Sequence, residues 1–80
     1  MLEFSNIMKR IKRVLYEEKN DRIYDKDVAK ALGFKPSYYA VIKKRERIPY
    51  EAIALFADKK NISLNWILFY KENAIIPPIK

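Results

Sequence analysis

The sequence predicts an all-α domain of five helices, and three observations support this prediction. Its apolar residues recur mostly every three or four positions, which is the spacing of a helix with one buried face. The 80 residues include only one glycine and four prolines, so few positions oppose helix formation. Half of the residues are hydrophobic, which suffices for one modest core. We therefore expect a single compact domain over residues 1–72, followed by an apolar tail over residues 73–80.

The first helix is expected over residues 6–18, with Ser5 as its N-cap. Its apolar side chains fall at i, i+4, i+7 and i+8, and therefore on one face: Ile7, Ile11, Val14 and Leu15. The second helix begins at Asp25, whose charge complements the positive end of the helix dipole. It is expected to end at Leu32, because Gly33 adopts a left-handed backbone without steric cost.

The remaining three helices have clear start and stop signals. The third is expected over residues 36–44, with proline at its first position, where a missing N–H does no harm. The same proline signal precedes a fourth helix over residues 50–60, which Asn61 closes. Ser63 is the expected N-cap of a short fifth helix over residues 64–71.

The most informative segment is residues 25–44, where two short helices are joined by a turn at Gly33. This is the pattern of a helix-turn-helix. Helices that cross steeply need a small residue at their contact, and Ala29 provides it. The side chains expected to face the core are Val28, Leu32, Phe34, Tyr39 and Ile42. The candidate reading surface faces outward and comprises Lys35, Ser37, Tyr38, Val41 and Lys44.

An exposed short helix of this kind fits the major groove of double-stranded DNA. Ser37 and Tyr38 offer hydrogen bonds to bases or phosphates, and Val41 offers an apolar contact to a thymine methyl. Basic residues at and beyond the end of the helix are expected to meet the DNA backbone: Lys43, Lys44, Arg45 and Arg47. The formal net charge of +7 also favours a polyanionic partner.

Three segments carry a resemblance to a known family. Residues 25–33, 45–51 and 61–68 read DKDVAKALG, RERIPYE and NISLNWIL. In this order they resemble the amino-terminal domain of phage repressors of the lambda-repressor-like fold, over about residues 7–70. The resemblance implies five helices with the third as recognition helix. It also implies sequence-specific transcriptional control, usually repression, by a homodimer on a palindromic operator.

Apolar residues beyond the expected core predict a second interface. The fourth helix is apolar on more than one side, and the candidate contact residues near the end of the chain are Phe69, Tyr70, Ile75 and Ile76. A homodimer formed through the fifth helix and the tail places two recognition helices about 34 Å apart, one turn of DNA. Two alternatives stay open: an antitoxin whose tail caps a toxin, and an interaction module that holds a protein partner.

Composition argues against several other functions. The chain has no cysteine and no histidine, so thiolate and imidazole metal sites and the commonest general base are missing. We expect no metal, no cofactor and no enzymatic activity. No segment approaches the roughly 20 apolar residues of a membrane span, and no secretory signal is recognisable, so a soluble, cytoplasmic protein is expected.

Two features of the sequence have both a structural and a functional interpretation. A basic cluster in the first helix is either a solvated face or a set of phosphate contacts: Lys9, Arg10, Lys12 and Arg13. Trp66 is either a stacking platform for a base or a core residue, and the core interpretation is favoured because apolar residues surround it in the sequence.

Overall fold

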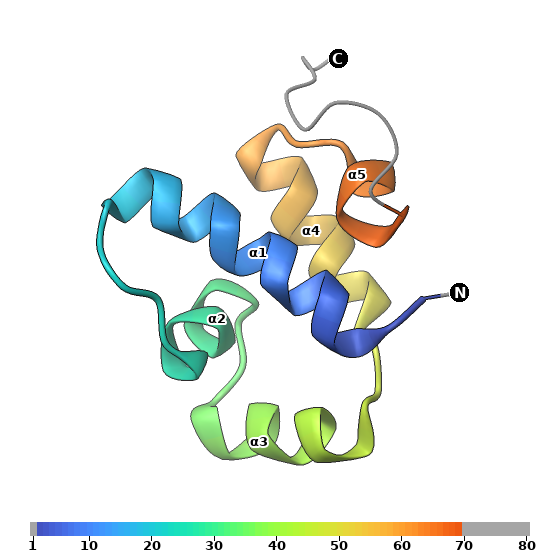
Figure 1. Cartoon of the computed structure of the whole chain (residues 1–80). Coiled ribbons are helices and arrows are strands. Elements are labelled where there is room, and N and C mark those ends of the chain that lie inside the picture. The colour runs from blue at the N-terminus through green and yellow to red at the C-terminus, as the bar shows by residue number, and fades with distance from the viewer. Residues whose placement is uncertain (1, 70–80) are drawn as a thin grey trace.

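The computed structural model describes residues 2–69, which form five α-helices without a strand (Figure 1). The helices are α1 (Phe4–Lys19), α2 (Asp25–Ala31), α3 (Pro36–Arg45), α4 (Tyr50–Lys60) and α5 (Leu64–Phe69). The all-α class and the order of the elements confirm the sequence prediction. Several predictions lie outside the described residues: the extension of the fifth helix to residue 71, the tail over residues 73–80, and the contact residues Tyr70, Ile75 and Ile76.

Most of the predicted helix ends are confirmed. Helix α4 has the predicted bounds, and Asn61 closes it with a left-handed φ of 60°. The Ser63 hydroxyl accepts a hydrogen bond from the Trp66 backbone N–H at 3.2 Å, as an N-cap does. Gly33 follows α2 with a φ of 82°. Proline, asparagine, Ser63 and glycine therefore mark these helix ends as predicted.

The predicted start of the first helix is wrong. Helix α1 begins at Phe4, Glu3 takes the N-cap position, and Ser5 lies in the first turn. The reason is burial, because the Phe4 ring is only 6% exposed and packs 6.1 Å from the Tyr39 ring, centroid to centroid. Extending the helix by half a turn brings this ring into the core, and that gain outweighs the capping preference of Ser5.

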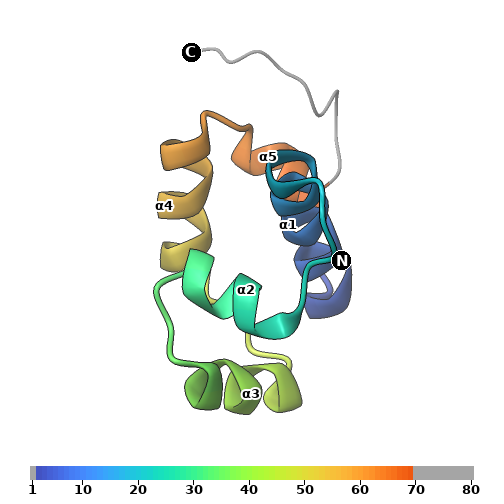
Figure 2. The same ribbon diagram turned by 90° about the vertical axis from the view of Figure 1, so that its left-hand side faces the viewer.

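The hydrophobic core lies where α1 passes the other helices (Figures 1 and 2). Buried side chains on α1 recur at helical spacing: Phe4, Ile7, Met8, Ile11 and Leu15. The other helices and the turn after α2 add Val28, Ala29, Leu32, Tyr39, Ile42, Ile53, Phe56, Ala57, Trp66 and Ile67. Every helix thus contributes at least two buried side chains, and each large one stabilises the fold by about 1.5–3 kcal/mol.

Helices α2 and α3 form the predicted helix-turn-helix. Ala29 is fully buried at the end of α2, and its carbonyl accepts a hydrogen bond from the Phe34 backbone N–H at 2.7 Å. Both views place α3 at one end of the molecule, beyond α2 (Figures 1 and 2). Helix α3 is therefore supported from one side and open on the other. Among residues 2–69, none of the helices is both long enough and apolar enough to cross a membrane.

Candidate nucleic-acid interface

Helix α3 exposes most of its surface. Of its ten residues, only Tyr39 and Ile42 are buried. Because successive residues of a helix are about 100° apart, these two define the inward direction. The side chains that point most nearly away from the core follow at i, i+3, i+4 and i+7: Ser37, Ala40, Val41 and Lys44. We call these four residues the outer stripe.

All eight side chains predicted to contact DNA are exposed: Lys35, Ser37, Tyr38, Val41, Lys43, Lys44, Arg45 and Arg47. The outer stripe contains three of them. Its fourth member, Ala40, was missed by the sequence analysis, because alanine offers no polar group. The helical spacing from Ser37 was the signal that could have found it.

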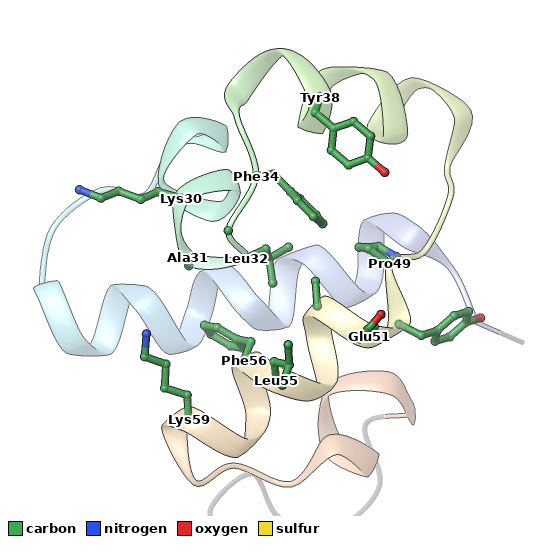
Figure 3. Close-up of a pocket in the computed structure, with 13 residues that line it drawn as sticks. Lys30, Ala31, Leu32, Phe34, Tyr38, Pro49, Glu51, Leu55, Phe56 and Lys59 are labelled. Carbon is green, nitrogen blue, oxygen red and sulfur yellow. The ribbon is translucent and has the colours of Figure 1, made fainter.

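Tyr38 lies on one flank of α3 and leans towards α4. Its ring stands edge-on to the Phe34 ring at a centroid distance of 5.0 Å. It borders an open groove of about 650 Å³ between the helix-turn-helix and α4 (Figure 3). The prediction that Tyr38 is exposed and Tyr39 buried is confirmed, since their exposed fractions are 51% and 2%. Tyr38 nevertheless belongs to the side of α3 rather than to its outer stripe.

Lys43 lies on the opposite flank and forms an ion pair with α2. Its Nζ is 2.6 Å from Oδ2 of Asp25, while Lys12 Nζ on α1 is 3.0 Å from Oδ1 of the same carboxylate. The hydrogen bond from Lys43 is the main cause that lowers the pKa of Asp25, and Lys12 adds to the effect. The ion pair with Asp25 therefore weakens the attraction between Lys43 and an external anion.

The other basic residues near the end of α3 have no such partner. Between residues 2 and 69, Lys44, Arg45 and Arg47 take part in none of the ion pairs. Glu46 reverses the chain after α3 with a φ of 54°. The Arg47 backbone N–H then donates to the Ile42 carbonyl at 2.9 Å, which fixes the turn. Three exposed cations thus lie at one end of the outer stripe: Lys44 within it, and Arg45 and Arg47 beside it.

Most of the basic cluster in α1 has a structural role. Arg10 Nη1 donates to the Ile67 carbonyl at 2.6 Å and lies 3.4 Å from that of Leu68, so it links α1 to α5. The Arg13 guanidinium lies 6.0 Å from the centroid of the Trp66 ring. With Lys12 bound to Asp25, three of the four residues contact other parts of the fold. Trp66 is buried, which confirms its interpretation as a core residue.

The predicted contact residues of the second interface are represented by Phe69 alone, which is exposed at the end of α5. As for metals, residues 2–69 contain no group of three or more acidic, histidine or cysteine side chains that could hold an ion.

Comparison of the chain with protein-family models, with curated proteins and with solved structures found no match. The function is therefore argued from the geometry and chemistry of α3 and its surroundings.

Proposed function

We propose that the protein is a sequence-specific regulator that binds double-stranded DNA by placing α3 in the major groove. The observation that carries the proposal is the outer stripe, a row of mostly small, exposed side chains at one end of the molecule. The major groove is about 12 Å wide and an α-helix with its side chains measures about 10–12 Å. Ser37, Ala40 and Val41 are short, so the backbone of α3 can approach the base edges closely.

The distribution of charge supports the same orientation. Lys44 at the end of the outer stripe, and Arg45 and Arg47 beside it, are exposed, where DNA phosphates flank a helix in the groove. Each phosphate that such a cation neutralises releases counterions, which favours binding at low salt. Electrostatic attraction then holds the protein on DNA, while the outer stripe supplies the discrimination between sequences.

The side chains of the outer stripe suggest how bases are read. Val41 and Ala40 suit thymine methyl groups, Ser37 can donate to or accept from a base edge, and Lys44 suits the acceptors of guanine. A homodimer that presents two copies of α3 to a palindromic site is part of the proposal, with repression as the expected outcome of occupying such a site.

The test is selection of sites from random duplex DNA, followed by affinity measurements across a salt series. The informative variant is Lys44→Ala/Arg45→Ala. Its matched control is Lys30→Ala/Lys59→Ala, which removes the same charge from two exposed lysines that Figure 3 places away from α3. We expect an enriched palindrome, and a slope of log K against log salt that flattens by about 2 for each bound subunit in the first variant only.

Two results would contradict the proposal. Selection without enrichment would exclude sequence-specific reading. Equal slopes for the two double variants would show that net charge alone, and not the position of α3, determines the attraction to DNA.

A further inference from the structure

An open groove beside α3 is a concave surface that the DNA proposal does not use (Figure 3). It has a volume of about 650 Å³ and lies between the end of α2, the turn, α3 and one side of α4 from Tyr50 to Lys59. Partly or fully buried apolar side chains form its base: Leu32, Phe34, Ala52 and Phe56. The groove is therefore built on the core and does not depend on a mobile loop.

Large apolar side chains stand exposed along this groove. Tyr38, Tyr50 and Leu55 all line it, and each is more than half exposed, Leu55 by 65%. A single exposed leucine is ordinary on a protein surface. Three large exposed side chains gathered around one groove are less ordinary, because exposed apolar surface that gathers in one place is typical of an interaction site. Tyrosine is also common among the residues that contribute most to binding at protein interfaces.

Charges at the two ends of the groove differ. Lys30 and Lys59 lie at one end, and Glu51 lies at the other, beside Pro49 (Figure 3). Neither lysine takes part in an ion pair with another residue of the 2–69 range. An occupant that complements this groove is apolar along its length and acidic where it meets the two lysines.

The open form of the groove favours a polypeptide over a small molecule. Small-molecule sites usually enclose about 70–90% of the ligand surface. This groove is instead open to solvent along its length, so a compact ligand would stay largely exposed. An amphipathic helix lays one apolar face into a groove of this kind and leaves its polar face in water.

We propose that this groove binds an amphipathic segment of a partner protein, whose apolar face packs on Tyr38, Phe34 and Leu55 and whose acidic residues meet Lys30 and Lys59. Because the groove lies on the flank of α3, an occupant leaves the outer stripe uncovered. Partner binding is thus compatible with the proposed DNA binding and does not depend on it.

The test uses the full chain labelled with nitrogen-15 and two synthetic 12-residue helical peptides. Both peptides carry leucine at positions 2, 5, 6 and 9, and their polar positions are glutamate in one and lysine in the other. We expect chemical-shift changes from the acidic peptide to be confined to residues that line the groove. The acidic peptide is expected to bind at least tenfold more tightly than the basic one.

Two variants separate the apolar and the charged contributions. Leu55→Ser is expected to weaken acidic-peptide binding by tenfold or more without unfolding the chain, because Leu55 is mostly exposed. Lys30→Ala/Lys59→Ala is expected to weaken it about fivefold, since exposed ion pairs contribute little individually. Lys44→Ala/Arg45→Ala serves as the control and is expected to leave peptide binding unchanged.

Three outcomes would overturn the proposal. The first is that neither peptide shifts groove residues, and the second is that the shifts map to the basic end of α3, which would indicate non-specific attraction. The third is that Leu55→Ser lowers the mass of the free protein in sedimentation, which would make the groove an interface between two copies of this chain. Site selection on DNA is measured separately, so failure of the DNA proposal is distinguishable from each of these.

Discussion

Asp25→Asn tests how α3 is held in place, because the Asp25 carboxylate joins three helices. It binds Lys12 of α1 at 3.0 Å and Lys43 of α3 at 2.6 Å, while lying at the first position of α2. Asparagine keeps the size of the side chain and removes its charge. The variant therefore isolates the electrostatic contribution of this site.

The expected loss of stability follows from the exposure of the three side chains, which ranges from 37% for Lys12 to 53% for Lys43. Exposed ion pairs contribute about 0.2–1 kcal/mol each. A carboxylate in the first turn of a helix adds about 0.3–1 kcal/mol. We expect Asp25→Asn to lower the free energy of unfolding by about 1.5 kcal/mol at pH 7. For a domain of this size the midpoint of thermal unfolding then falls by roughly 6–12 °C.

The same substitution is expected to strengthen attraction to DNA. It releases Lys43 from its partner and removes a negative charge from the flank of α3. Affinity for random duplex DNA should rise, with a salt slope steeper by about 1. A less stable protein that binds DNA more tightly is an unusual combination, which a general defect in folding does not produce.

Thermal unfolding followed by circular dichroism, across pH and salt, provides the assay. Because the pKa of Asp25 is lowered in the folded state, its stabilisation is present above the ordinary pKa and is lost as the pH falls through the folded one. The difference between wild type and Asp25→Asn should therefore shrink as the pH falls below 3.8, the ordinary pKa of Asp25, and should also shrink in about 1 M salt. Asp58→Asn is the control, an exposed carboxylate in none of the ion pairs between residues 2 and 69. A difference that does not shrink in acid would refute the reasoning.

Four other substitutions test the backbone, the anchor of α5 and a buried tyrosine. Gly33→Ala should lower the free energy of unfolding, measured in urea, by about 1 kcal/mol, because alanine is strained at a positive φ. The strain is the whole effect, since an added methyl meets nothing within 4 Å. Glu46→Asn should instead stabilise by about 0.5–1 kcal/mol, since asparagine tolerates the left-handed conformation better; an unchanged midpoint for either variant would argue against backbone strain. Arg10→Ala removes the donor to the α5 carbonyls and should lower the free energy of unfolding by about 1.5–3 kcal/mol. Amide hydrogen exchange should become faster in α5 than in α2, and equal acceleration in both helices would contradict a local role. Burial and, secondarily, Asp25 raise the pKa of Tyr39 from 10.0 to about 12. The neutral tyrosine therefore stabilises the fold fully below pH 10, and this contribution of up to about 2 kcal/mol to the free energy of unfolding is lost as the pH rises towards 12. Tyr39→Phe should flatten this alkaline loss, and an identical pH profile would count against the shift.

The sequence was most informative where a single residue type determines the local backbone. Pro49 and Asn61 mark both ends of α4 because one fixes φ and the other tolerates a left-handed turn. Asn20 closes α1 in the same way with a φ of 57°, and this signal was present in the sequence but not used. Glu46 takes the same conformation without any signal, because glutamate does not favour it.

The parts of the site that were not predicted depend on distant residues. The pairing of Lys43 with Asp25 joins residues 18 positions apart across the turn, and the spacing of charges along a chain does not specify such a contact. The lean of Tyr38 towards α4 likewise depends on Phe34 and on the packing of α4. Helical periodicity separates inward from outward residues, but it does not show towards which neighbour a flanking side chain turns.

The peripheral place of α3 has a consequence for the evolution of this protein. Only two of the ten residues of α3 are buried, so substitutions in the outer stripe leave the core intact and change stability by about 0.5 kcal/mol or less. Under the proposed function, new DNA specificities can therefore arise one residue at a time without a loss of fold. The same separation makes these four positions suitable for a randomised library, in which variants are selected for new operators while the scaffold stays constant.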